Sequence, residues 1–115
     1  MALDCDLVIP CRDEAAALPA VLALVPVGMR VIVVDNGSRD GTAEVARRLG
    51  ATVVDESRPG YGAAVHAGME AASAQYVAVL DGDGSMDPRE LLPLLDAVSS
   101  GAATMACGRR RPAVR

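Results

Sequence analysis

The chain has 115 residues, of which 51% are apolar, and this suits one domain with its own core. All of its basic residues are Arg, and the absence of Lys excludes mechanisms that need a lysine nucleophile or Schiff base. A net charge of −4 and an aromatic content of only 2% argue against nucleic acid as a partner.

Short β-branched runs alternate along the chain with Ala-rich stretches of helical character. The pattern predicts, in chain order, a strand at 6–10, a helix at 15–24, a strand at 30–35, a helix at 42–49, a strand at 52–55, a helix at 63–72, a strand at 76–81, a helix at 88–98 and a strand at 104–107. Residues 31–34 are apolar on both faces of their strand, as in a parallel sheet covered by helices. We therefore predict an α/β domain over residues 1–108 and a flexible basic tail at 109–115.

The cysteines and the apolar runs indicate where the protein resides. Cys5, Cys11 and Cys107 have no CxxC spacing, which predicts neither a disulfide framework nor a four-ligand zinc site. The longest uncharged run, 15–29, is too short and too interrupted by proline to span a bilayer, and acidic residues stand where an export signal has positive charge. We expect a cytoplasmic protein.

Acidic residues follow the first, second and fourth predicted strands, and open parallel sheets bind ligands beyond these carboxyl ends. Asp81 and Asp83 alternate along an extended segment and can face one cleft, with Gly82 leaving room between them. Two carboxylates suit Mg²⁺ or Mn²⁺ bridged to a diphosphate. The same pair also fits an acidic turn without a ligand.

Other polar residues have both a structural and a functional interpretation. Asp35 precedes an Asn-Gly turn, and it either belongs only to that turn or accepts hydrogen bonds from a base or a ribose. Asp40 or Thr42 is predicted to cap the following helix. Asp87 and Glu90 have the spacing of a capping box, which favours a structural role.

Residues 58–62 form a glycine-rich turn that opens the third predicted helix. The turn lacks the third glycine of a dinucleotide fingerprint and follows the third strand, which argues against a Rossmann cofactor site. A loop that leads into a helix can still hold an anion through backbone N–H groups, with Arg58 adding charge. His66 is interpreted as an ordinary helical residue.

Four groups of short motifs follow one another along the chain: Val8-Ile9-Pro10 with Asp13-Glu14, Val34-Asp35-Asn36-Gly37-Ser38 with Asp40-Gly41-Thr42, Gly60-Tyr61-Gly62-Ala63-Ala64 with Gly68, and Leu80-Asp81-Gly82-Asp83-Gly84-Ser85 with Asp87-Pro88. In this order and at this spacing, they resemble family 2 glycosyltransferases of the GT-A fold over residues 7 to 110. The branch that includes the dolichyl-phosphate mannose and glucose synthases is the most similar.

The resemblance implies glycosyl transfer from a nucleoside-diphosphate sugar that carries GDP or UDP. The implied nucleotide-sugar site comprises Pro10, Asp13, Glu14, Asp35, Gly37, Ser38, Arg58, Gly62, Asp81, Gly82 and Asp83. Asp81 and Asp83 are the implied ligands of Mg²⁺ or Mn²⁺, which would neutralise charge on the departing diphosphate. No general base is assigned.

Family members generally continue well beyond this length with an acceptor surface. The resemblance therefore implies a truncated GT-A domain, the nucleotide-sugar-binding half, and we expect self-association through the edge that the other half would cover. A polyprenyl phosphate is an acceptor that needs little base assistance, and it would place the protein at the inner face of the membrane. The alternative is a noncatalytic half-domain that pairs with another chain. A receiver domain is disfavoured, since such domains use a lysine after the fifth strand.

Overall fold

The computed structural model describes residues 4–100. Strands and helices alternate as β1 (Cys5–Cys11), α1 (Leu18–Ala23), β2 (Arg30–Asp35), α2 (Thr42–Arg48), β3 (Thr52–Asp55), α3 (Tyr61–Ala71), β4 (Tyr76–Val79), a 3₁₀ helix η1 (Pro88–Glu90) and α4 (Leu91–Ser99). The order confirms the predicted alternation. The predicted strand at 104–107 and the predicted tail at 109–115 lie outside the described residues.

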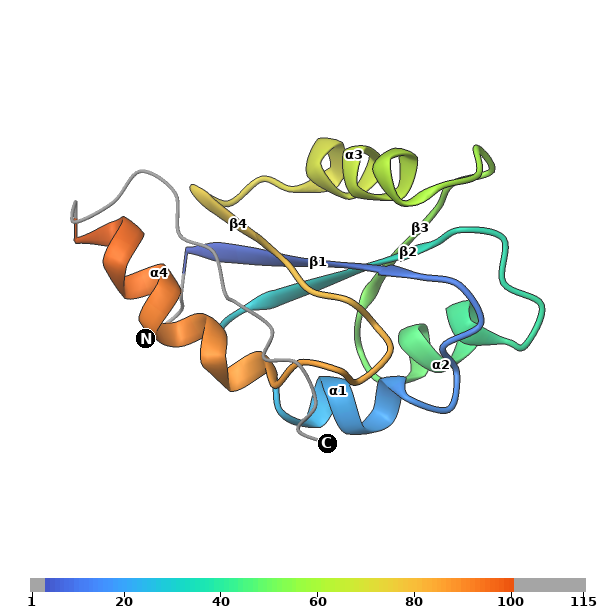
Figure 1. The fold of residues 1–115 in the computed structure, drawn as a ribbon, viewed down its shortest axis with the longest axis horizontal. Coiled ribbons are helices and arrows are strands. Elements are labelled where there is room, and N and C mark those ends of the chain that lie inside the picture. Colours follow the sequence, from blue (N-terminus) through green and yellow to red (C-terminus); the bar gives the residue numbers. More distant parts are fainter. Residues whose placement is uncertain (1–3, 101–115) are drawn as a thin grey trace, which may run out of the picture.

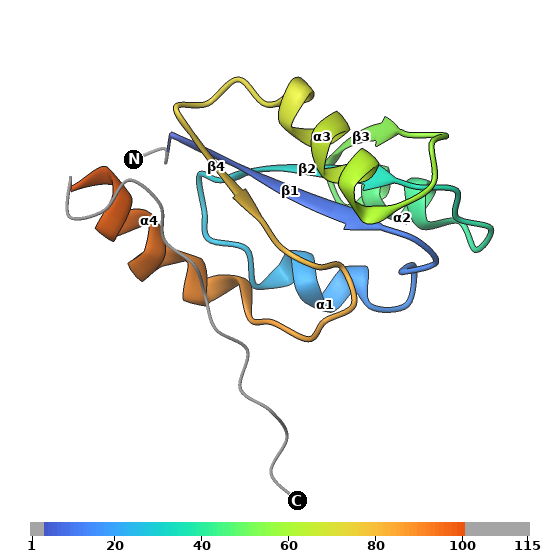
Figure 2. The ribbon, with the colours of Figure 1, turned by 45° about the horizontal axis from the view of Figure 1, so that its top comes forward.

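The strands form one parallel sheet in the order β3-β2-β1-β4. Helix α3 covers one face, while α1 and α4 lie on the other, as Figures 1 and 2 show. Val8 and Ile32 pack with Ala64 of α3, whereas Leu7 and Ile9 pack with the cluster beneath α1. This alternation follows from the two-residue period of a strand. Both faces of β1 are therefore buried, as the apolar runs predicted.

Helix α3 lies close against the sheet because it presents small residues. Gly68 is buried, and a Cβ atom at this position would be 2.3 Å from Cγ1 of Val8 and 3.1 Å from Cγ2 of Val34. Only a glycine fits this contact without a shift in the structure. The close packing fixes the start of α3 relative to the carboxyl ends of β1 and β2, where the predicted site lies.

A buried carboxylate joins the elements at the opposite, amino-terminal ends of the strands. Asp6 is only 3% exposed, and its carboxylate accepts hydrogen bonds from Nε and Nη2 of Arg30 at 3.1 and 3.0 Å. The backbone N–H groups of Ser73 and Ala74 donate to the same carboxylate at 2.8 and 3.1 Å. Asp6 thereby links β1, β2 and the segment that leads into β4.

The structure corrects several predicted boundaries. Helix α1 begins at Leu18 because the carbonyl of Glu14 accepts the N–H groups of Ala17 and Leu18 in a turn that precedes the helix. Helix α3 begins at Tyr61, two residues earlier than predicted. Strand β4 ends at Val79, although the N–H of the next residue still bonds to β1. The apolar pattern used for the prediction does not contain these hydrogen bonds, and element ends are its least reliable part.

The predicted helix caps have different outcomes. Asp87 caps η1 by accepting the N–H of Arg89 at 2.9 Å, as predicted. The prediction for α2 is wrong, because its N-cap is Gly41 in a left-handed conformation with φ 82°. Within residues 4–100, no helix has the length and apolar character needed to cross a membrane.

Candidate functional site

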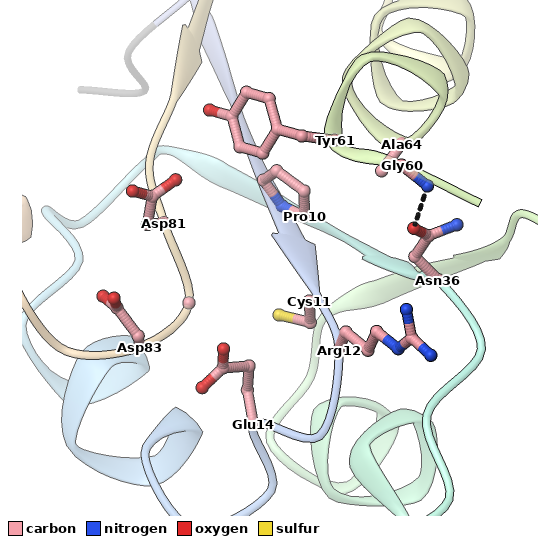
Figure 3. A pocket seen from close by; sticks show the side chains of 11 residues that line it. Pro10, Cys11, Arg12, Glu14, Asn36, Gly60, Tyr61, Ala64, Asp81 and Asp83 are labelled. Atoms are coloured by element: carbon pink, nitrogen blue, oxygen red, sulfur yellow. Dashed lines mark hydrogen bonds between the residues drawn. The ribbon is translucent and has the colours of Figure 1, made fainter.

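A cavity of about 410 Å³ opens where β1, β2 and β4 end and α3 begins (Figure 3). This is the edge of a parallel sheet at which ligands are expected. The lining residues are Pro10, Cys11, Arg12, Glu14, Asn36, Gly60, Tyr61, Ala64, Asp81, Gly82 and Asp83.

One side of the cavity, here called the acidic wall, consists of Glu14, Asp81 and Asp83 (Figure 3). The pKa of Glu14 is raised, first by burial and then by neighbouring negative charges, of which that of Asp83 is the largest. One oxygen of Asp83 accepts the N–H of Ser85 at 2.9 Å. These carboxylates form a local concentration of negative charge that a cation would stabilise.

The donors of the acidic wall fit Mg²⁺ or Mn²⁺ in one particular way. Carboxylate oxygens are the hard ligands that these ions prefer. Among residues 4–100, however, no group of three or more His, Cys, Asp or Glu side chains could hold a metal ion. Mg²⁺ commonly uses one or two carboxylates together with phosphates and waters. The wall therefore fits an ion that binds together with a diphosphate.

Gly82 places the two aspartates against β1. The residue is buried, and a Cβ atom would lie 2.6 Å from Sγ of Cys11 and 3.2 Å from Cγ2 of Ile9. Burial raises the pKa of the Cys11 thiol to about 12, so this side chain is a neutral packing group beneath the cavity. The segment with Asp81 and Asp83 can approach β1 this closely only because Gly82 has no side chain.

We expect Gly82→Ala to lower the free energy of unfolding by about 1–3 kcal/mol, since the added methyl group overlaps a buried sulfur. Urea unfolding measures this loss. Cys11→Ala removes the overlapping sulfur atom. Gly82→Ala should therefore lower the free energy of unfolding less in the Cys11→Ala background than in the wild type. Equal losses with and without Cys11 would contradict the proposed overlap.

The loops after β1 and β2 interlock beside the cavity. The N–H of Asp13 donates to Oγ of Ser38 at 2.9 Å, and the N–H of Arg39 donates to Oδ1 of Asp13 at 2.8 Å. The N–H of Glu14 donates to Oγ1 of Thr42 at 3.0 Å. Asp13 has φ 56°, a left-handed conformation that Asp tolerates. These contacts fix the backbone that presents Glu14 to the cavity.

Thr42→Val should destabilise the protein by about 1–3 kcal/mol. Thr42 is 0% exposed, and its hydroxyl accepts from Glu14 and is hydrogen-bonded to the Asp40 carboxylate. Valine has nearly the same shape but leaves the partly buried N–H of Glu14 without its acceptor. Urea unfolding tests this, with Thr42→Ser as the variant that restores the hydroxyl and Thr52→Val, at an exposed position in β3, as the matched control. A loss of the same size in the control would refute the explanation.

The structure brings part of the predicted site together. Of the predicted residues, Pro10, Glu14, Asp81, Gly82 and Asp83 line the cavity. The others are not lining residues: Asp13, Gly37, Ser38 and Arg58 lie in the flanking loops, Asp35 ends β2, and Gly62 lies in the first turn of α3.

Hydrogen bonds account for the position of two of these flanking residues. Asp35 accepts the N–H of Ser38 at 3.0 Å. The guanidinium of Arg58 donates to Glu56 at 3.0 and 3.1 Å and lowers the pKa of that carboxyl to about 2. His66 lies exposed on α3, with Nδ1 2.9 Å from Oε1 of Glu70, and does not line the cavity. In each of these pairs, the two partners lie close together in the sequence.

Several lining residues were not predicted as site residues, although some belong to the motifs that carry the resemblance: Cys11, Arg12, Asn36, Gly60, Tyr61 and Ala64. Arg12 contributes a positive charge to the lining. Tyr61 is 60% exposed, and its pKa is raised by partial burial, by the charge of Asp81 and by a hydrogen bond to that side chain. The sequence feature that could have identified Tyr61 is an aromatic residue in a glycine-rich turn, in a chain with only two Tyr.

The sequence and the fold match known proteins. The family model for glycosyl transferase family 2 matches residues 6–114. An uncharacterised glycosyltransferase of Mycobacterium tuberculosis is 56% identical over 105 residues, which are 91% of this chain and 48% of that protein. The polyprenol monophosphomannose synthase of Mycolicibacterium smegmatis is 37% identical over 116 residues, covering 90% of this chain and 43% of its own length.

Among solved structures, the fold is similar to that of glucosyl-3-phosphoglycerate synthase from Mycobacterium tuberculosis in complex with Mn²⁺, UDP and glucosyl-3-phosphoglycerate. The TM-score is 0.69 at 25% sequence identity, over 83% of this chain and 39% of that one. The chain thus spans about half the length, or less, of the relatives it matches. The parallel sheet and its flanking helices confirm the predicted GT-A fold. The chain belongs to glycosyl transferase family 2.

Proposed function

We propose that these residues form the donor-binding part of a metal-dependent glycosyltransferase that uses a GDP- or UDP-sugar. The observation that carries this proposal is the acidic wall of Glu14, Asp81 and Asp83 beside a cavity at the carboxyl ends of the strands. A related structure, which contains Mn²⁺ and UDP, supports it. Carboxylates alone would repel a diphosphate, so donor binding at this wall requires a cation.

Within this proposal, Asp81 and Asp83 would hold Mg²⁺ or Mn²⁺ beside the diphosphate. The bound ion supplies Lewis-acid stabilisation of the nucleoside diphosphate as it leaves the sugar. Pro10, Glu14 and Gly82 would contact the donor from the cavity lining. Six residues beside the cavity are also proposed nucleotide ligands: Asp13, Asp35, Gly37, Ser38, Arg58 and Gly62.

A polyprenyl phosphate is the proposed acceptor. A relative that is named polyprenol monophosphomannose synthase supports this class. The phosphate of such a lipid is already anionic near neutral pH, which reduces the need for a general base on the protein. The protein would then work at the cytoplasmic face of the membrane, where it meets the lipid phosphate.

Calorimetric titration with UDP and with GDP, in Mn²⁺ and again in EDTA, tests the proposal. We expect saturable binding of at least one nucleotide in Mn²⁺ and much weaker binding in EDTA. The corresponding nucleotide sugar should compete for the same site. If neither UDP nor GDP binds in Mn²⁺, the proposed donor site is refuted.

A second candidate function is donor binding without transfer by these residues alone. This candidate is favoured because the chain matches only 48% of the Mycobacterium tuberculosis relative and 43% of the Mycolicibacterium smegmatis relative. Incubation with radiolabelled nucleotide sugar and polyprenyl phosphate separates the two candidates, because only a transferase moves the label into lipid. Binding without lipid labelling would favour the second candidate.

Self-association is a further part of the proposal. Strand β4 is at one edge of the four-stranded sheet in the described part of the chain. An uncovered strand edge offers N–H and C=O groups to another chain. Light scattering after size-exclusion chromatography would detect the resulting homo-oligomer.

A further inference from the structure

Asn36 uses its side-chain amide to hold the loop between β3 and α3. Its Nδ2 donates to the carbonyl oxygens of Glu56 and Arg58 at 2.9 and 2.7 Å. Its Oδ1 accepts the N–H of Gly60 at 3.2 Å, the bond that Figure 3 draws as a dashed line. A primary amide has two N–H donors, so both are used in these contacts. Asn36 lines the cavity without a remaining donor for a ligand.

Asn36 is itself fixed to the sheet. It directly follows β2, and its backbone N–H donates to the carbonyl of Cys11 at the end of β1 at 2.9 Å. The N–H of Glu56 donates to the carbonyl of Asp35 at 3.0 Å, which anchors the start of the loop. The amide of Asn36 therefore joins a rigid sheet edge to the loop that precedes α3.

The held loop leads into one wall of the cavity, here called the α3 wall: Gly60, Tyr61 and Ala64. Gly60 has φ 111° and ψ 152°, a conformation that is almost restricted to glycine. Its backbone N–H donates to Oδ1 of Asn36. The acidic wall, in contrast, is built on the segments that follow β1 and β4, whereas the Asn36 amide bonds to Glu56, Arg58 and Gly60.

We propose that Asn36 is a positioning residue of the nucleotide site, which sets the affinity for a nucleoside diphosphate by holding the α3 wall opposite the acidic wall. The inference rests on the proposed function of the cavity. The hydrogen bonds of the Asn36 amide to the loop between β3 and α3 are here called the tether. When the tether is absent, this loop samples other conformations, and part of the binding free energy is used to order it again. Asn36 thus acts through Gly60 and Tyr61 and not by direct contact.

A double-mutant cycle tests this mode of action. Asn36→Ala, Tyr61→Ala and the double variant are titrated with UDP and with GDP in Mn²⁺. We expect Asn36→Ala to weaken the binding of the nucleotide by about tenfold. The double variant should bind within about twofold of Tyr61→Ala, because the tether has no effect once the wall is truncated. Fully additive losses would overturn the inference.

Two controls separate positioning from stability. Asp6→Asn removes the charge of the carboxylate that Arg30 and Ser73 contact at the opposite end of the sheet. This variant should destabilise the protein and leave nucleotide affinity unchanged. Asn36→Asp keeps an acceptor for Gly60 but removes both donors and places a negative charge near two carbonyl oxygens. It should weaken binding at least as much as Asn36→Ala, and wild-type affinity in this variant would overturn the inference.

Amide hydrogen exchange in the ligand-free protein tests the tether independently of any nucleotide. We expect the amide of Gly60 to exchange about tenfold faster in Asn36→Ala than in the wild type and in Asp6→Asn. Unchanged exchange at Gly60 would overturn the inference even if nucleotides bind. Faster exchange in a protein that binds no nucleotide would instead refute only the proposed function.

Discussion

Replacing Asp83 by Asn should weaken the binding of UDP or GDP by about 100-fold when Mn²⁺ is present. Asp83 lines the cavity together with Asp81 and Glu14, and its carboxylate is a proposed ligand of the ion that neutralises the diphosphate. The amide of Asn is a neutral and weaker donor for a hard cation. Calorimetric titration of wild type and variant in Mn²⁺ measures the loss.

The same titration in EDTA gives the opposite expectation. Without a cation, Asp83 only repels the diphosphate, so the variant should bind the nucleotide at least as well as the wild type. Asp87→Asn is the matched control, because Asp87 caps η1 and does not line the cavity. A similar loss in Mn²⁺ and in EDTA would show that Asp83 does not act through a metal.

Asp6→Asn should lower the free energy of unfolding by about 2 kcal/mol at pH 7. Hydrogen bonds from Arg30 are the largest cause that lowers the pKa of the buried Asp6 carboxyl, from 3.8 to about 2, and the backbone N–H groups of Ser73 and Ala74 contribute further. The folded protein therefore prefers the ionised form by this amount. Urea unfolding of wild type and variant measures the difference.

The pH dependence of this difference has a definite sign. Because the pKa of Asp6 is lower in the folded state, its ionisation stabilises the fold above pH 3.8, and this contribution is lost as the pH falls to about 2. The gap between wild type and Asp6→Asn should shrink over that range. Asp4→Asn, at an exposed carboxylate on the same edge of the sheet, is the control. A constant gap from pH 7 to pH 2 would contradict this assignment.

Much of the acidic wall could be predicted from the sequence. Asp81 and Asp83 directly follow an apolar strand run, and the carboxyl ends of parallel strands meet at one edge, so their convergence follows from local pattern and fold class. Gly82 was predicted to leave room between them and to belong to the nucleotide-sugar site. The structure adds that the space beside it is filled by Cys11, a contact between residues far apart in the chain.

The α3 wall could not be predicted in the same way. The Asn-Gly pair at residues 36–37 indicates a turn, and nothing near it in the sequence indicates that the Asn36 amide binds Glu56, Arg58 and Gly60, which lie 20 to 24 residues away. Asp13 and Ser38 were predicted as nucleotide ligands. The structure shows that the N–H of Asp13 donates to Oγ of Ser38 across two loops, and a contact with nucleotide stays a prediction for both residues.

The sequence by itself determined the alternation of strands and helices, the parallel sheet, the edge at which acidic residues gather and the family resemblance. These depend on apolar periodicity and on short motifs, which are properties of neighbouring residues. Only the tertiary structure decided which motif residues line the cavity and which ones cross-link the loops. Those outcomes depend on hydrogen bonds and close packing between distant segments, which form only when the chain is folded.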